Sequence, residues 1–238
     1  MRILIILLGL YFSITVTAQN EITSQDILNN SIKFHDPKGK LASGDFTLYL
    51  EESRPDGSIR KTQTRFAPAK EIFEIISFRE EHEIKYKINK NNVEVLLDGS
   101  SEFTEDEAKK LRINKERASM MKNYYLYLWH LPMKLNDPGT LIDQNHKTKV
   151  FNSHSCYELK ITYDKTVGHD IWYFYFDKQD FQMRGYRFYH DESKNDGEYI
   201  YIEGLTAFKD IMIPAKRDWY THKEDKFLGS DLLVKISK

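Results

Sequence analysis

Four short clusters hold the side chains that could transfer protons: His35-Asp36, His130, His169-Asp170 and His190. Histidine exchanges a proton near neutral pH and also binds metals, so clusters that converge at one end of a sheet could form a general acid/base pair or a metal site. Each cluster also fits an ordinary role, because aspartate before a proline or before a strand supports a turn. We therefore assign no catalytic residue and keep six candidates. They are His35, Asp36, His130, His169, Asp170 and His190.

Familiar catalytic and cofactor motifs are missing from the sequence. It contains no HExxH, no GxSxG, no P-loop, no GxGxxG and no CxxC. We expect no cofactor and assign no metal ligand. The sequence leaves open whether the protein is an enzyme and favours a non-catalytic role.

The charge content limits the kinds of partner that the protein can bind, and the cysteine content limits its covalent cross-links. The chain has 35 basic and 36 acidic residues, and both signs are mixed along it. Binding to a phosphate backbone needs a positive stripe, so a nucleic-acid partner is not expected. Cys156 is the single cysteine, which excludes an intrachain disulfide and favours a partly buried thiol over a reactive one.

The N-terminal residues have the pattern of a secretory signal peptide. Arg2 supplies the positive start, an apolar run extends from Ile3 to Val16, and Val16-Thr17-Ala18 places small residues at a cleavage site. The run is shorter than the roughly 20 residues of a membrane-spanning helix. We expect residues 1–18 to be removed and the protein to be exported, periplasmic or secreted, with no transmembrane anchor and no cysteine for a lipid anchor.

Turn signals divide residues 19–238 into short segments of a single β-rich domain. A helix is expected from Thr23 or Ser24 to about Phe34, and a helical insert at about 104–131 begins with a capping box at Thr104 and ends before Pro132. Alternation and turn residues predict strands at 45–52, 59–67, 71–79, 82–89, 92–99, near 147–151, 157–163, 170–176, 183–190, 197–204, 210–220 and 231–237.

Both faces of the later strands carry bulky side chains. In 170–176, Trp172 and Phe174 point one way and Tyr173 and Tyr175 the other, whereas a sheet with one wet face would alternate with polar residues. The inward face could line a groove with tyrosine hydroxyls as its polar contacts, or both faces could be filled by packing. Trp129 closes a tyrosine-rich helix, where core packing is favoured over ligand contact.

Several blocks carry a resemblance to a known family. They are IKFHDPKGK (32–40), YYLYLWHLPMKLNDPGT (124–140), ITYDKTVGHDIWYFYFD (161–177), GYRFYHDESKNDGEYIYIEG (185–204), IPAKRDWY (213–220) and LGSDLL (228–233). In these blocks the chain resembles an uncharacterised family of exported bacterial proteins, over nearly all of the mature sequence. In architecture such proteins resemble the LolA/LolB-like half-barrels. The resemblance implies a mainly β, α+β fold: one curved antiparallel sheet of about eleven strands with helices covering its concave side.

The resemblance also implies where a ligand would lie. A concave face of this kind would hold an acyl chain or another apolar group, with Trp172, Phe174, Tyr186 and Tyr201 as candidate lining residues and Trp129 as a further candidate. The sequence does not decide which alternate set of side chains faces inward.

Three hypotheses on function remain. The first is an exported, non-catalytic envelope protein that binds an apolar or lipid-like ligand, or a lipidated protein, in the concave groove. The second is a hydrolase or isomerase that uses histidine and carboxylate groups at the sheet rim. The third is a structural or protein-binding module with a filled sheet and an exposed apolar patch. The sequence does not identify the ligand, a protein partner or the oligomeric state.

Overall fold

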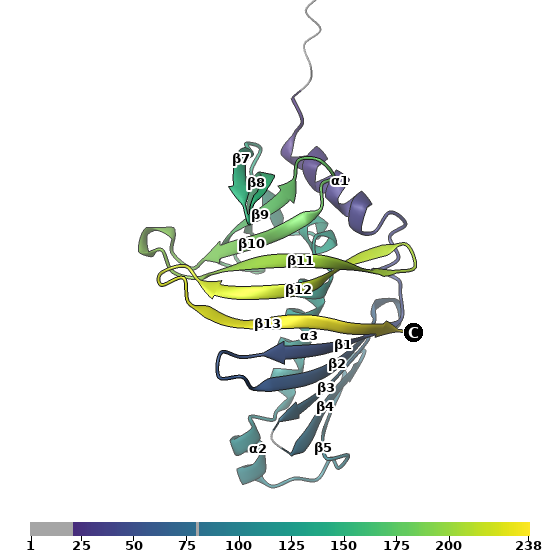
Figure 1. The fold of residues 1–238 in the computed structure, drawn as a ribbon. Coiled ribbons are helices and arrows are strands. Elements are labelled where there is room, and N and C mark those ends of the chain that lie inside the picture. The colour runs from purple at the N-terminus through teal and green to yellow at the C-terminus, as the bar shows by residue number, and fades with distance from the viewer. Residues whose placement is uncertain (1–20, 80) are drawn as a thin grey trace, which may run out of the picture.

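A computed structural model of the protein describes residues 21–79 and 81–238. The expected signal peptide lies outside these residues. Within them, thirteen strands form one antiparallel sheet that curves and stays open (Figure 1). The strands are β1 (Phe46–Ser53), β2 (Ile59–Ala67), β3 (Ile72–Arg79), β4 (His82–Asn89), β5 (Asn92–Leu97), β6 (Thr140–Ile142), β7 (Lys147–Phe151), β8 (His154–Tyr163), β9 (Ile171–Asp177), β10 (Met183–Tyr189), β11 (Glu198–Phe208), β12 (Ile211–Thr221) and β13 (Phe227–Ser237).

The order of the strands joins two meanders, the first formed by β1–β5 and the second by β8–β13. It runs β5-β4-β3-β2-β1-β13-β12-β11-β10-β9-β8-β6, and β7 pairs with β8. The C-terminal strand β13 therefore lies between β1 and β12, in the middle of the sheet. The predicted mainly β class with a single curved sheet is confirmed. The strand count is thirteen rather than about eleven, and the three-residue β6 is the described strand that matches no predicted segment.

Helices cover the inner, concave face of the sheet. They are α1 (Ser24–His35), α2 (Glu105–Leu111) and α3 (Lys115–Trp129), and α3 runs behind the sheet in Figure 1. Thr23 and Thr104 each begin a helix with a reciprocal capping box, as predicted at Thr104. The expected continuous insert is broken, because Arg112 adopts a left-handed conformation at the end of α2 and Asn114 caps α3. No helix within the described residues is long and apolar enough to cross a membrane.

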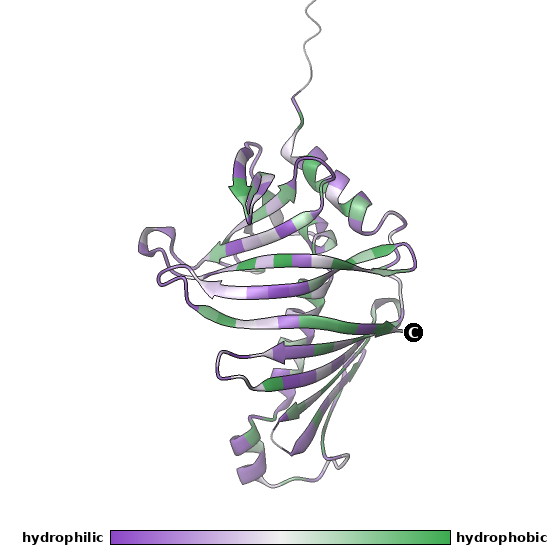
Figure 2. Cartoon of the chain, viewed as in Figure 1, coloured by the Kyte–Doolittle hydropathy of each residue, from purple (hydrophilic) through white to green (hydrophobic). Residues whose placement is uncertain are grey.

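The first meander has one apolar and one charged face. Inward residues such as Phe66, Phe73 and Ile75 are buried in the core. The alternation of hydrophobic and hydrophilic residues along these strands is visible in Figure 2. This half of the sheet follows the simple rule for a strand with one buried side.

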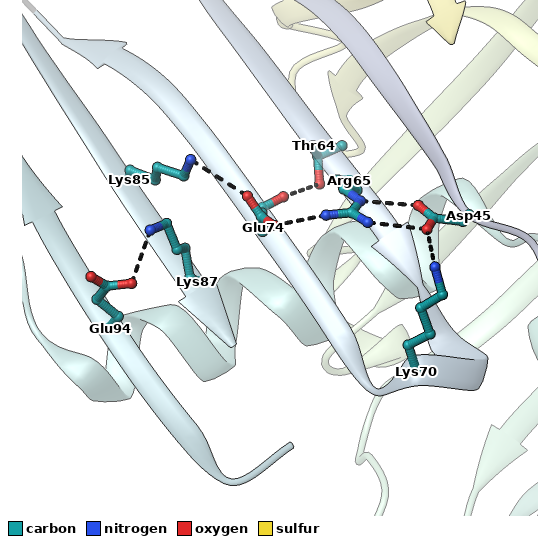
Figure 3. Close-up of polar contacts among 8 residues, drawn as sticks. All are labelled: Asp45, Thr64, Arg65, Lys70, Glu74, Lys85, Lys87 and Glu94. Carbon is teal, nitrogen blue, oxygen red and sulfur yellow. Dashed lines mark hydrogen bonds and ion pairs between the residues drawn. The ribbon is translucent and has the colours of Figure 1, made fainter. Parts of the chain in front are cut away.

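Ion pairs connect the outer face of the first meander (Figure 3). Arg65 pairs with Asp45 at 3.0 Å and with Glu74 at 3.0 Å, and Lys87 pairs with Glu94 at 3.0 Å. Arg65, Glu74, Lys87 and Glu94 stand opposite one another across β2, β3, β4 and β5, so opposite charges alternate across the strands. Such cross-strand pairs favour this register.

The second meander has aromatic rings on both faces, and the rings on its outer face are only partly covered. Phe151 of β7 stacks on Tyr175 at 3.8 Å and meets Tyr201 edge-on at 5.1 Å. Farther along the same face, Tyr199 and Tyr220 stack on each other at 5.1 Å and remain partly exposed. On the outer face, β7 and contacts between aromatic rings therefore cover the sheet, whereas helices cover its inner face.

Candidate functional site

A cavity of about 640 Å³ lies between α3 and the inner face of the second meander. Its lining residues come from α3, from five strands and from the turns beside them. They are Arg54, Tyr124, Tyr127, Leu128, Asp170, Trp172, Phe188, His190, Glu198, Trp219, Leu228 and Asp231. The cavity is placed at one end of the sheet, where β1 and β10 finish and where β9 and β11 begin.

Aromatic side chains form most of the apolar wall. Trp172 lies 4.8 Å from the ring of Phe188 and 5.6 Å from the ring of Tyr127, measured between ring centroids. The Tyr127 hydroxyl is hydrogen-bonded to the Tyr163 hydroxyl at 2.6 Å, which fixes the helix side of this wall. Trp219 adds a second indole from β12. The wall therefore offers ring faces and edges to an apolar or cationic group.

An Asp–His pair stands at the rim of the cavity. The Nδ1 atom of His190 lies 2.7 Å from Oδ1 of Asp170, and this hydrogen bond raises the pKa of His190 above its ordinary value. Glu198 lies near this pair. Burial raises the pKa of Glu198, and the positive charge of His190 opposes the shift. Three proton-exchanging groups therefore share one end of the cavity.

Asp231 is the most buried carboxylate of the cavity. One of its oxygens accepts a hydrogen bond of 2.8 Å from Nε1 of Trp219, and the residue is 7% exposed. Burial raises the pKa of Asp231 to about 6, and the nearby Glu52 carboxylate adds to the rise. This carboxylate therefore reaches its midpoint of protonation near pH 6 and is mostly ionised above neutral pH.

A row of buried and half-buried charged residues lies under α3, and Asp231 is one of its members. Across neighbouring strands, Arg60 stands opposite Glu52, Glu52 opposite Asp231, and Asp231 opposite Arg217. Arg60 donates two hydrogen bonds to Glu52, at 2.8 and 2.7 Å, and the Tyr125 hydroxyl donates a third at 2.7 Å. These bonds hold the middle of α3 against β1 and β2.

Arg217 fixes the end of the same helix. Its guanidinium is fully buried, donates to the backbone carbonyl of Leu128 at 2.9 Å and lies 4.0 Å from the ring centroid of Trp129. Trp129 is 2% exposed and does not line the cavity. Arg217 and the ring of Trp129 thus position the C-terminal end of α3, which forms the helix wall of the cavity.

The five ligand-binding candidates occupy three different environments. Trp172 lines the cavity. Phe174 and Tyr186 lie on the same face, fully buried beside Trp172, at 5.9 Å between ring centroids in both cases. Trp129 packs under Arg217. Tyr201 lies on the outer face against Phe151, away from the cavity.

The structure brings together only two of the six proton-transfer candidates, Asp170 and His190. His35 is buried; its Nδ1 donates to the carbonyl of Met212 at 2.7 Å and its Nε2 accepts from the amide of Met183 at 3.1 Å. Asp36 accepts from the amides of Lys40 and Leu41, both at 2.8 Å, and so supports a turn.

Neither of the two remaining histidines is hydrogen-bonded to the Asp170–His190 pair within the described residues. His130 is buried against the rings of Phe46 and Phe66. His169 is exposed and borders a smaller hollow of about 230 Å³ beside Asp170 and Trp172. Burial lowers the pKa of both His35 and His130 to about 4. Those two rings are therefore neutral packing residues at physiological pH.

Sequence reasoning missed two carboxylates of the cavity, Glu198 and Asp231. Both occupy inward positions of strands that otherwise carry large apolar residues inward, such as Ile200 and Leu233. A charged residue at an inward position is the signal that could have found them, but it requires knowing which face is inward. Within residues 21–79 and 81–238, no group of three or more His, Cys, Asp or Glu side chains could hold a metal ion.

Comparisons with known proteins identify the fold. A family model described as a family of unknown function, DUF6503, matches residues 1–235. The structure is similar to that of a LolA superfamily protein from Nitrosomonas europaea, with a TM-score of 0.54, 11% identity, and coverage of 91% of this chain and 93% of that one. It also matches a DUF1329 family protein from Desulfovibrio piger, with a TM-score of 0.44, 11% identity, and coverage of 89% and 91%. No curated protein matches the sequence.

Proposed function

The chain belongs to this family of unknown function, DUF6503, and we propose that it is an exported envelope protein that binds an apolar or lipid-like ligand in the cavity under α3, without catalysing a reaction. The observation that carries the proposal is the cavity itself. Its volume of about 640 Å³ is within the range of roughly 300–1,000 Å³ that small-molecule sites occupy. Its walls combine indole, phenyl and leucine side chains with a few polar groups.

The helix side of the cavity supports a binding role. Tyr124 is 46% exposed and Leu128 is buried, although they lie one turn apart on α3, so the helix presents a ring to the open space rather than filling it. The hydrogen bonds from Tyr125 and Arg217 hold the helix in this position. A preformed site loses less conformational entropy on binding than one that must be assembled.

The expected location and the fold agree with this role. The N-terminal pattern of residues 1–18 predicts export, and the fold is LolA-like. In an envelope compartment a lipid-like ligand needs an apolar enclosure to leave a membrane. The cavity would supply that enclosure for the part of the ligand that water solvates poorly.

A fluorescence assay tests the proposal. N-phenyl-1-naphthylamine, a neutral apolar probe, should bind the protein comprising residues 19–238 and gain fluorescence. Trp172→Ala should weaken binding at least about tenfold, because it removes the ring that joins both walls of the cavity. Tyr201→Ala is the matched control, since it removes an aromatic ring from the outer face. Equal effects of the two substitutions, or no binding at all, would contradict the proposal.

Native mass spectrometry on protein purified from the envelope without detergent would identify the natural ligand. A stoichiometric lipid or acylated species should accompany the wild-type protein and be lost in Trp172→Ala. A clean mass for the bare chain after exposure to cationic, neutral and anionic lipids would count against lipid binding.

The Asp170–His190 pair favours a second candidate function, hydrolysis or isomerisation of the bound ligand. Nδ1 of His190 faces Asp170, which leaves Nε2 as the atom that could exchange a proton with a ligand. If the co-purified ligand is converted on incubation, and His190→Gln stops the conversion without weakening binding, the enzyme is the correct assignment. An unchanged ligand supports the binding protein.

A further inference from the structure

The cavity contains more negative than positive groups. Its carboxylates are Asp170, Glu198 and Asp231, and the one permanently charged cation among its lining residues is Arg54, an exposed residue in the turn after β1. His190 is paired with Asp170, with 2.7 Å between Nδ1 and Oδ1. The two carboxylates that remain, Glu198 and Asp231, are both more buried than the arginine.

Glu198 has no ion pair or side-chain hydrogen bond with any residue of the described chain. It stands directly opposite Phe188 in the β10–β11 pairing, and Phe188 in turn contacts Trp172. A carboxylate that is partly desolvated beside aromatic rings loses hydration without gaining a partner, which costs free energy. A ligand that supplied a positive charge at this point would offset that cost.

Asp231 is at the other side of the cavity, again beside an indole. Trp219 binds one carboxylate oxygen, and the opposite residue on β1 is Glu52, whose own charge is neutralised by Arg60. Arg217, opposite Asp231 on β12, directs one guanidinium nitrogen to the Leu128 carbonyl. Asp231 forms no ion pair within residues 21–79 and 81–238, although the charges of Arg217 and of Arg54 are close enough to lower its pKa.

We propose that the ligand of this cavity is a cationic amphiphile, with a protonated amine or quaternary ammonium head beside Glu198 and an apolar body against Trp172, Phe188 and Trp219, while Asp231 across the cavity adds a second negative charge. The inference rests on the proposed function and specifies the ligand's charge. Aromatic faces attract organic cations through their quadrupole, and buried carboxylates add a direct charge attraction. The same carboxylates repel a fatty acid or another anionic head.

A series of ligands with one chain and three heads tests the charge. Decyltrimethylammonium, decyl maltoside and decanoate are titrated into the protein at pH 7.5 by calorimetry, each below its micelle concentration. The ammonium compound should bind about tenfold more tightly than decanoate, with the maltoside between them. The double variant Glu198→Gln and Asp231→Asn should lose this preference while staying folded, since the amide introduced at position 231 keeps an oxygen that can accept from Trp219.

Glu203→Gln is the matched control on the same strand. Its side chain is 55% exposed and pairs with Lys216 at 3.3 Å outside the cavity, so the preference for the ammonium head should persist. Circular dichroism checks that each variant is folded. If decanoate binds as tightly as the ammonium compound, or the double variant keeps the preference, the charge inference is wrong. Binding of N-phenyl-1-naphthylamine that depends on Trp172 would then leave the proposed function standing, whereas failure of every probe would overturn both.

Discussion

His130 shows how a residue with catalytic chemistry can serve as packing. It is buried between the rings of Phe46 and Phe66, and burial lowers its pKa to about 4. His35, also buried, shows the same shift while both of its nitrogens are hydrogen-bonded. In the unfolded chain both rings take up a proton near pH 6.5, so the unfolded state binds more protons than the folded state between about pH 6.5 and 4.

Acid should therefore destabilise the protein through these histidines. As the pH falls from 7 to 4.5, each should remove about 2–3 kcal/mol from the free energy of unfolding. Asp231 acts in the opposite direction, because its folded pKa of about 6 is above its unfolded value and its protonation favours folding as the pH drops. His130→Leu should reduce the stability difference between pH 7 and 4.5, measured by urea unfolding, by about 2 kcal/mol.

The exposed His169 is the control for this prediction. His169→Leu should leave the stability difference unchanged. If His130→Leu behaves like the control, His130 is protonated in the folded protein and its burial does not lower its pKa.

The sequence predicts Asp170 and His190 as two separate candidates and does not indicate that they form a pair. They are 20 residues apart, and nothing in their types indicates that the turn before β9 and the end of β10 meet. Antiparallel pairing of Tyr189 with Ile171 brings them together. The aromatic candidates show the corresponding limit: alternation groups Trp172 with Phe174, but it does not say that Tyr201 is on the other face.

Among the elements, α3 decides whether the cavity exists. Its sequence alone does not fix its position, because only Ala118, Met121, Tyr125, Leu128 and Trp129 are buried. Tyr125 and the Leu128 carbonyl are tied to the sheet by hydrogen bonds to Glu52 and from Arg217. The buried charged row thus has an architectural role, which is to hold a helix at a set distance from aromatic strands.

Replacing Arg217 tests this role. Arg217→Met should lower the free energy of unfolding by about 2–4 kcal/mol, because it leaves the Leu128 carbonyl without its donor and removes a cation from beside Asp231. Arg65→Met is the control on the outer face: Arg65 is one-third exposed in its ion pairs, and its loss should cost about 1 kcal/mol or less. Urea unfolding measures both. A cost for Arg217→Met no larger than that of the control would show that the guanidinium does not stabilise α3.

Element boundaries were predictable where turn chemistry is strong. The turn at Arg54–Gly57 separates β1 from β2 as expected, and Gly57 has a φ of 82°, which glycine adopts readily. The break between α2 and α3 was not predicted, because Arg112 adopts its left-handed conformation with no glycine or proline to indicate it. β6 was missed for another reason: three residues are too few to show alternation.

At the scale of the whole molecule, one hydrophobic core spans both meanders. Leu48 and Phe73 of the first meander belong to the same buried cluster as Phe174 and Tyr186 of the second, and Tyr125 of α3 lies in it too. The two meanders differ in their outer faces but share this inner one. We therefore expect them to unfold together.

Three probes should show a single transition in urea. Tryptophan fluorescence reports α3 and the second meander, and far-ultraviolet circular dichroism reports the whole sheet. The thiol of Cys156 is fully buried, and burial raises its pKa to about 12, so labelling by a disulfide reagent should require unfolding. All three midpoints should coincide. Labelling of Cys156 well before the fluorescence change would show that the region around β8 opens separately.

The central place of β13 has a consequence for how the protein is made. A ribosome synthesises β1 before β13 (residues 227–237), the last of the described strands, yet β1 finds its second neighbour only in β13. Until then, β1 and β12 each present an unpaired edge, the kind of surface that joins strands of different chains. The nascent protein is thus most exposed to aggregation just before β13 is synthesised. Cells that make it are expected to keep it bound by a chaperone until β13 is available.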